Sequence, residues 1–196
     1  MLFEVAAQQL CDVGRFAFER GWLPATSGNL SARYDRGMAI TRSGAHKGEL
    51  QVQDILDADL QGNARSGKPS AETGIHVHLY ERFPDAGAVL HTHSPRATVL
   101  SRGRTALVFE GYEIQKAFEG FDTHESRVVL PVVPNNQDIP RLVTTLEPLS
   151  LTAGFLIEGH GVYTWARSVA DARRHLEALE FLFECECVRQ QLGGAA

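Results

Sequence analysis

The chain has 196 residues, of which 43% are hydrophobic and 22% are charged, and its formal net charge is −5. This composition excludes a disordered chain and is enough for a full core, so we expect a single domain spanning 1–196. The acidic balance and the scattered basic residues argue against a nucleic-acid partner or an anionic membrane surface, and no apolar stretch reaches transmembrane length.

The first half of the chain alternates helical and strand-like patterns. A glycine- and turn-rich stretch at 26–31 predicts a loop, and a second loop is expected at 42–48. Ser70 is the expected N-cap of a helix that Pro84 ends. In chain order, the expected elements are a helix at 2–20, strands at 37–41 and 54–60, a helix at 70–83 and a strand at 86–91.

The second half continues the mixture of helices and strands, which predicts an α/β fold. The chain contains neither GxGxxG after a first strand nor GxxxxGK[ST], so neither a dinucleotide fold nor a P-loop is supported. In chain order, the expected elements are a short helix that begins at Pro95, a strand at 127–133, a helix at 136–146, strands at 153–158 and 162–165, and a long helix at 168–191.

Three histidines follow predicted strands. His91 and His93 lie at the end of the strand at 86–91, and residues i and i+2 of a strand point to the same face. His160 directly follows another apolar strand. Two neighbouring imidazoles and a third from a second strand are typical of a divalent-metal site with an open position. The sequence therefore predicts a metalloenzyme, with zinc as the expected ion and one ion per chain.

The other histidines do not repeat this arrangement. His76 and His78 fall inside a predicted helix, where residues i and i+2 lie about 200° apart and cannot hold one ion. We therefore assign both to packing or to the helix surface. His124 and His175 have polar neighbours in the sequence and are expected at the solvated surface.

Two carboxylates are candidates for acid–base chemistry or metal binding. Glu72 lies at the first turn of a predicted helix, where the helix dipole stabilises an anion, and this also describes an ordinary first-turn acid. Glu113 lies in a partly apolar segment, where desolvation would raise its pKa and suit it to general acid–base catalysis. The residues alone do not choose Glu113 over Glu110 or Glu119.

Two short loops and one helix start have the composition of an anion-binding site. Each loop combines hydroxyl groups, a glycine and free backbone N–H groups, and a serine at a helix N-terminus adds a hydroxyl and the helix dipole. We therefore expect a small, phosphorylated substrate. The expected binding residues are Ser27, Gly28, Asn29, Ser43, Gly44 and Ser70.

The cysteines and the first residues of the chain are relevant to the expected cellular compartment. Cys185 and Cys187 lie two apart on a predicted helix, where their side chains diverge, and Cys11 is distant in sequence. We expect neither a disulfide nor a zinc clamp. The first residues show no signal-peptide pattern, so a cytoplasmic location is expected.

The order and spacing of these motifs resemble the class II aldolase family, which includes fuculose-phosphate aldolases, ribulose-phosphate 4-epimerases and the adducin head. The resemblance covers about residues 21–186 and implies an αβα fold around a mainly antiparallel sheet. It also implies a homotetramer with zinc at the subunit interface, and Glu72 as a further ligand or base. The motifs are Ser27-Gly28-Asn29, Ser43-Gly44, Pro69-Ser70-Ala71-Glu72, His91-Thr92-His93 and Gly159-His160-Gly161.

Three further stretches, 110–117, 136–138 and 159–165, resemble the branch of this family that dehydrates methylthioribulose 1-phosphate in methionine salvage. In that branch, the acid at the position of Glu113 takes the acid–base role. The aldolase pattern has two serines before the glutamate, and Ala71 replaces the second here. A sugar-phosphate aldolase or epimerase is the enzyme alternative. A non-catalytic binding module is the other, and the intact histidine trio argues against it.

The last helix also favours an oligomer. Its apolar residues cover more of its circumference than one core-facing stripe requires. These residues are Leu176, Leu179, Phe181, Leu182 and Phe183.

Overall fold

The computed structural model describes residues 1–193, so residues 194–196 of the expected domain lie outside the described residues. The helices are α1 (Phe3–Glu19), α2 (Thr73–Arg82), α3 (Pro95–Ser101), α4 (Ile139–Leu146) and α5 (Val169–Gln191), and the 3-10 helices are η1 (Lys47–Glu49), η2 (Val52–Asp54) and η3 (Glu113–Ala117). The strands are β1 (Asn29–Tyr34), β2 (Gly37–Thr41), β3 (Ile55–Ala58), β4 (Ala88–Thr92), β5 (Ala106–Phe109), β6 (Val128–Val133), β7 (Phe155–Ile157) and β8 (Gly161–Ala166).

The strands form one eight-stranded sheet in the order β3-β2-β1-β4-β8-β7-β6-β5. All neighbouring pairs are antiparallel except β6 and β7, so the expected α/β fold with a mainly antiparallel sheet is confirmed. The register places Asn29 opposite His91, and His91 opposite Tyr163. These three residues therefore lie in one row across β1, β4 and β8, and they face the same side of the sheet.

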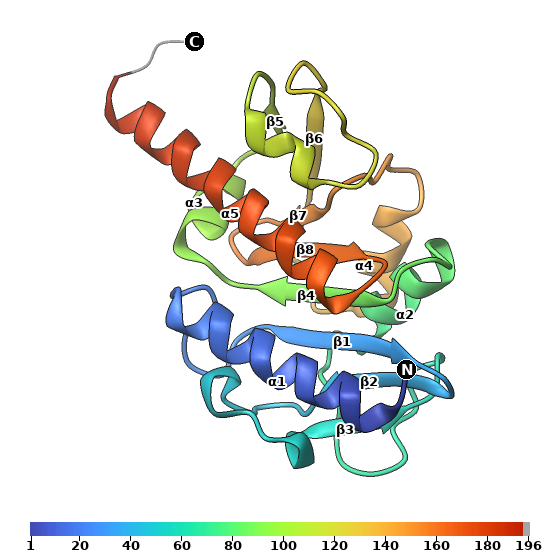
Figure 1. Ribbon diagram of the computed structural model, residues 1–196. Helices are drawn as coiled ribbons and strands as arrows, with labels where there is room; N and C mark the ends of the chain where they lie inside the picture. The colour runs from blue at the N-terminus through green and yellow to red at the C-terminus, as the bar shows by residue number, and fades with distance from the viewer. Residues whose placement is uncertain (194–196) are drawn as a thin grey trace.

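Helices cover both faces of the sheet (Figure 1), as the αβα arrangement requires. One apolar core joins the sheet to α1, α3 and α5, and the other joins it to α2 and α4. Alternation along β4 assigns its residues to the two cores, because Leu90 packs in the first and Val89 in the second. None of the described helices is both long and apolar enough to span a membrane.

Three local expectations were wrong. Strand β1 begins at Asn29, inside the loop that was expected at 26–31. Asn29 and Ser31 are buried in this strand because side-chain hydrogen bonds satisfy their polar groups. Strand β5 was not expected at all. Helix α2 begins at Thr73 with Glu72 as its N-cap residue, and the Ser70 hydroxyl accepts a hydrogen bond from the Glu72 N–H at 3.2 Å.

Two expectations about α5 were also wrong. Leu176, Leu179, Leu182 and Phe183 are fully buried within the chain itself, and only Phe181 is half exposed. The width of the apolar face therefore reflects packing against the sheet and its neighbours, not a free surface. His175 is buried as well, with its Nδ1 donating to the Trp165 carbonyl at 3.0 Å.

Candidate metal centre

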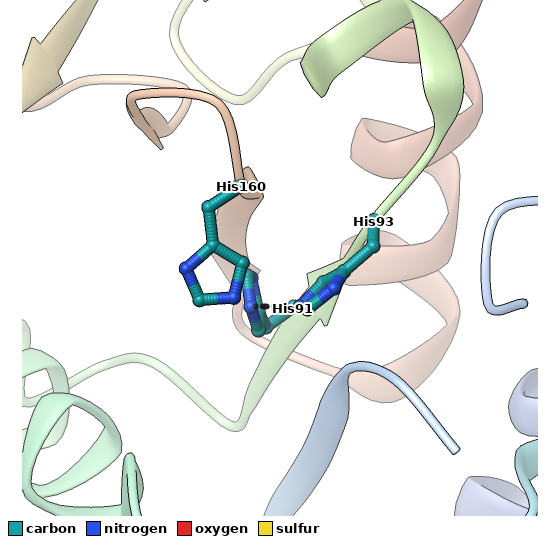
Figure 2. A group of neighbouring side chains, drawn as sticks. All are labelled: His91, His93 and His160. Atoms are coloured by element: carbon teal, nitrogen blue, oxygen red, sulfur yellow. Dashed lines mark hydrogen bonds between the residues drawn. The ribbon is translucent and has the colours of Figure 1, made fainter. Parts of the chain in front are cut away.

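The three predicted metal ligands converge at one end of the central strand pair (Figure 2). His91 lies at the end of β4, His93 directly follows this strand, and His160 lies in the turn between β7 and β8. Each histidine offers a ligand atom, and these three atoms all lie within 4.8 Å of one another. The Nε2 atoms of His91 and His93 are 2.8 Å apart. The structure thus brings together residues that are 69 positions apart in the chain, from His91 to His160.

Local packing sets the orientation of His91. Its Nδ1 donates to the Val162 carbonyl at 3.0 Å, which leaves the lone pair of Nε2 directed into the site. The ring stacks on Tyr163, with centroids 4.0 Å apart and planes 9° apart. Gly161 permits this close approach of β8, because a Cβ atom there would lie 2.0 Å from the Thr92 carbonyl oxygen.

The electrostatics of the trio suit metal binding. Burial holds the pKa of His91 well below its usual range and lowers the pKa of His93 to about 3, so both imidazoles are neutral, which is the form that binds a cation. The Nδ1 atom of His160 is buried without a hydrogen-bond partner among the described residues. Neutral, oriented imidazoles with an unsatisfied nitrogen fit a divalent cation.

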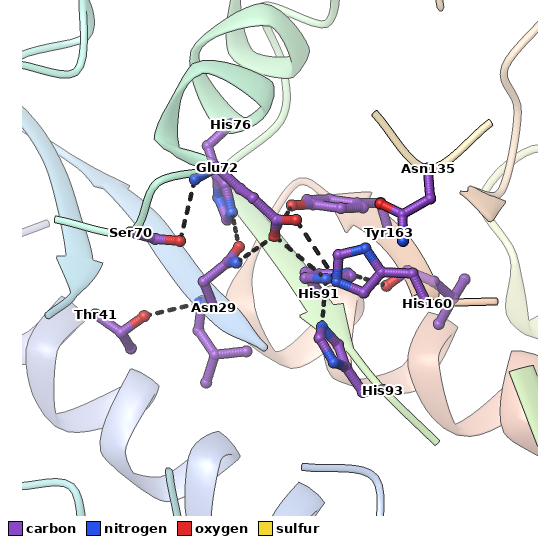
Figure 3. A network of polar contacts seen from close by, with 12 residues as sticks. Asn29, Thr41, Ser70, Glu72, His76, His91, His93, Asn135, His160 and Tyr163 are labelled. Carbon is purple, nitrogen blue, oxygen red and sulfur yellow. Dashed lines mark hydrogen bonds and ion pairs between the residues drawn. The ribbon is translucent and has the colours of Figure 1, made fainter. Parts of the chain in front are cut away.

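Glu72 lies directly beside the trio (Figure 3). Its Oε2 accepts hydrogen bonds from Asn29 Nδ2 and from the Tyr163 hydroxyl, each at 2.8 Å, and lies 3.3 Å from His91 Nε2. Its other oxygen, Oε1, is 3.6 Å from His160 Nε2. The acid expected at a helix start is therefore an N-cap residue that can serve as a fourth ligand or as a base.

A buried chain of hydrogen bonds continues behind Glu72 (Figure 3). Asn29 uses its Nδ2 for Glu72, so its Oδ1 accepts from His76 Nε2. Burial lowers the pKa of His76 to about 4, so the ring is neutral and its Nδ1 accepts from Ser31 Oγ at 2.7 Å. Ser31 in turn lies 2.8 Å from the Tyr80 hydroxyl. His76 is a packed residue, as expected, but its link to Glu72 has no signature in the sequence.

A cavity of about 580 Å³ opens beside the trio. Five of the six expected anion-binding residues line it, whereas Ser27 does not, and the Ser27 hydroxyl is buried without a partner among the described residues. Gly28 has a φ of 70°, and a Cβ there would lie 2.5 Å from the His91 carbonyl oxygen, so this loop needs glycine. Gln137, from the stretch 136–138 that carries the family resemblance, also lines the cavity, whereas sequence reasoning missed Lys47, Thr98 and Asn135.

Comparisons with known proteins agree with this architecture. The family described as Class II Aldolase and Adducin N-terminal domain matches residues 8–187. The chain belongs to the class II aldolase and adducin family. It is 52% identical over 191 residues, 94% of both chains, to a methylthioribulose-1-phosphate dehydratase from Methylococcus capsulatus (strain ATCC 33009 / NCIMB 11132 / Bath).

Two further relatives extend the comparison. The chain is 54% identical over 192 residues to the methylthioribulose-1-phosphate dehydratase of Pseudomonas syringae pv. syringae (strain B728a), which covers 93% of this chain and 94% of the relative. Among solved structures, l-fuculose-1-phosphate aldolase from Thermus thermophilus superposes with a TM-score of 0.81 at 25% identity, over 100% of each chain. The class II aldolase family is metal-dependent, and His91, His93 and His160 of this member could hold a metal ion.

Glu113 lies apart from this class II aldolase site. It is in η3, its side chain is 73% exposed, and it does not line the cavity of its own chain. A hydrogen bond from Lys116 at 2.6 Å lowers the pKa of Glu113, and His124 Nδ1 lies 3.8 Å away. The expected rise of its pKa through desolvation was wrong, because apolar neighbours in sequence do not cover this side chain. Its catalytic role stays a prediction.

Proposed function

We propose that this class II aldolase family member dehydrates 5-methylthioribulose 1-phosphate to 2,3-diketo-5-methylthiopentyl 1-phosphate and water, a reaction of methionine salvage. The observation that carries this proposal is the identity of more than half of the aligned residues to relatives named for this activity. A cavity lined by His93, His160, the Glu72 carboxylate and the anion-binding loops supports it.

The proposed ligands of one Zn²⁺ per chain are His91, His93 and His160. Three convergent imidazoles suit zinc, and they leave room for a further ligand. When bound, the cation would polarise the C2 carbonyl of the substrate and stabilise negative charge on its oxygen. Glu72 is the proposed fourth ligand or secondary acid–base group, because its Oε2 lies 3.3 Å from His91 Nε2.

The proposed phosphate site lies where the loops of β1 and β2 meet the start of α2. Backbone N–H groups at Gly28 and Gly44 and the hydroxyls of Ser43 and Ser70 border the cavity there. A C1 phosphate bound at this site would fix the positions of the substrate atoms C2, C3 and C4 relative to the imidazoles. The binding energy of the phosphate would thereby orient the reacting carbons. Asn29 borders the same site, and its Nδ2 donates a hydrogen bond to Glu72.

The proposed general acid–base is Glu113. Its carboxylate would take the C3 proton, and the electron pair of the C3–H bond would form the C3–C4 double bond as the C4 hydroxyl leaves with a proton as water. The enol that results becomes the 2,3-diketone by tautomerisation. Because Glu113 lies outside the cavity of its own chain, we propose that it acts in the cavity of a neighbouring subunit.

We also propose a homotetramer in the cytoplasm. The number four rests on the family resemblance, and the exposed position of Glu113 supports a site completed by a second copy. All three cysteines are free, which is consistent with a reducing compartment. A small-molecule sugar phosphate is the proposed partner, without a nucleic acid or a membrane.

The alternative function is that of a sugar-phosphate aldolase. Two observations favour it, namely the likeness to l-fuculose-1-phosphate aldolase and the position of Glu72 beside the histidines. Product analysis after incubation of the metal-loaded protein with 5-methylthioribulose 1-phosphate separates the two. Dehydration gives the diketone, whereas cleavage of the C3–C4 bond gives dihydroxyacetone phosphate and methylthioacetaldehyde. Cleavage products without the diketone would contradict the proposal.

A further inference from the structure

Lys47 is a buried lysine in the wall of the cavity. It begins η1, directly after the loop that contains Ser43 and Gly44, and only 1% of its surface is exposed. Its Nζ donates hydrogen bonds to two backbone carbonyls, Thr26 O at 3.0 Å and Ala45 O at 2.8 Å. These carbonyls belong to the two loops that border the proposed phosphate site, so the ammonium lies between them.

Burial of this ammonium away from any carboxylate destabilises the folded protein. Buried charges are normally paired with an opposite charge, and the hydrogen-bond partners of Lys47 among residues 1–193 are neutral carbonyls. Burial lowers the pKa of Lys47 to about 8. An ammonium has three N–H donors, and two are used, so one remains for a ligand. The two neutral carbonyls require only N–H donors, so the link between the loops does not by itself explain the charge.

The other cation of the cavity wall is already compensated. Arg42 lines the same cavity, but its Nη2 donates to Asp54 Oδ1 at 2.7 Å. Among the cavity-lining residues that the structure describes, Lys47 is therefore the basic side chain, of Lys47 and Arg42, that has no carboxylate partner. A bound anion would supply the missing opposite charge.

We propose that the Lys47 ammonium binds the phosphate group of the substrate and provides the positive charge that the surrounding loops lack. The inference rests on the proposed function for the identity of the whole substrate, but the ligand group it requires is a phosphate dianion. Backbone N–H groups and hydroxyls alone would bind a neutral acceptor at the same place. Lys47 therefore makes the site selective for phosphorylated over unphosphorylated sugars.

The first test compares Lys47→Gln with Lys68→Gln in the metal-loaded protein. Glutamine keeps a donor for the loop carbonyls but removes the charge, and Lys68 is an exposed lysine whose carbonyl accepts from the Ser43 N–H. Calorimetric titration with inorganic phosphate should show binding about 10- to 100-fold weaker in Lys47→Gln, as expected for a lost hydrogen bond to a charged group. Lys68→Gln should change it less than about 3-fold, because exposed charges are screened.

The kinetic readout separates binding from a structural role. In Lys47→Gln, KM for the phosphorylated substrate should rise by a similar factor while kcat stays within a few-fold, because the reacting carbons lie away from the phosphate. Unchanged affinity for inorganic phosphate in Lys47→Gln, or an equal loss in both variants, would overturn the inference. Phosphate titration requires no turnover, so an inactive protein that binds phosphate through Lys47 would refute the proposed function alone.

A measurement on the unaltered protein covers the case in which Lys47→Gln does not fold. The chain contains three lysines, Lys47, Lys68 and Lys116. Selective isotope labelling of lysine therefore gives three side-chain signals in an NMR spectrum. Addition of inorganic phosphate to the metal-loaded protein should shift the Lys47 signal and leave the other two nearly unchanged. A spectrum in which the Lys47 signal does not move at saturating phosphate would contradict the proposal.

Discussion

Glu72 and Glu113 represent two kinds of acidic position in the same chain. Glu72 is largely buried, and Asn29 and Tyr163 donate to it beside the histidine trio. Glu113 is 73% exposed and is paired with Lys116 on the surface. Both were candidates in the sequence, but the folded chain organises only the first.

The difference has a physical origin. A carboxylate that is removed from water needs hydrogen-bond donors in place, and the row of residues across β1, β4 and β8 supplies them to Glu72. A solvated carboxylate needs none, so nothing in the chain holds Glu113 in one place. The single chain therefore organises the candidate metal centre, whereas Glu113, in its proposed acid–base role, would need a second copy to reach a substrate. The following predictions test this division, from the largest expected effect on turnover to the smallest.

Removal of a metal ligand should have the largest effect. His91→Ala should abolish bound metal and lower turnover by roughly 10⁴-fold or more, since a catalytic cation supplies several kcal/mol of charge stabilisation. Elemental analysis of the purified variant and a dehydration assay measure both. His78→Ala is the control, because His78 lies on α2 outside the trio, and it should retain the metal. Full metal content in His91→Ala would contradict the assigned ligands.

Glu113→Gln should be next in size. Loss of a positioned acid–base group costs about 10²–10⁴-fold in turnover, and bound metal should stay unchanged because Glu113 is not a ligand. Glu110→Gln is a matched control, since Glu110 is also exposed and pairs with Arg127 at 3.0 Å. Glu72→Gln should instead mainly weaken metal binding. If Glu113→Gln kept near wild-type turnover, the assignment would be wrong and the aldolase alternative would be favoured.

Tyr163→Phe should have an intermediate effect. The change removes the hydroxyl that donates to Glu72 but keeps the ring that stacks on His91. Loss of such an outer hydrogen bond typically costs about 10- to 100-fold in metal affinity, measurable by competition with a chelator. Tyr34→Phe provides the comparison, because it also loses a hydrogen bond to a carboxylate, Asp57, away from the site. Equal affinities in both variants would mean that Tyr163 does not position Glu72.

Glu180 should affect stability and hardly affect turnover. Burial raises its pKa to about 8 from 4.5, and neither carboxylate oxygen has a hydrogen-bond partner among the described residues. Because the folded state retains the proton longer than the unfolded state, its contribution is complete below about pH 4.5 and falls as the pH rises to about 8. Urea unfolding at pH 5 and pH 8 should show a decrease of about 2–4 kcal/mol that Glu180→Gln lacks. The same decrease in both proteins would exclude Glu180 as its source.

Much of the fold was predictable because the periodic patterns are strong. Helices α1 and α5 and strands β2, β4 and β8 were expected close to their observed bounds. Strand β1 was not, because Asn29 and Ser31 are polar residues whose burial depends on partners 43 or more positions away. The fold was therefore predictable where burial is apolar, and missed where burial relies on hydrogen bonds between distant segments.

The residues of the candidate site also fall into a group that was predictable from the sequence and a group that was not. The trio could be predicted because an HxH pair on a strand must share a face. Lys47 had no signal, since a single lysine in a glycine-containing loop is ordinarily exposed and its burial follows from the packing of two loops. The surroundings of Glu113 were misjudged because the Lys116 pair and the exposed face of η3 depend on tertiary structure.

Complementation between two inactive variants tests the central claim most directly, namely that a dehydratase site combines the metal centre of one chain with Glu113 of another. His91→Ala and Glu113→Gln chains would be produced together, and dehydration of 5-methylthioribulose 1-phosphate measured in the mixed oligomers. A site is complete when the imidazoles come from one variant and the carboxylate from the other, so about a quarter of wild-type activity should return if subunits mix at random. Mixed oligomers as inactive as either variant alone would contradict the claim.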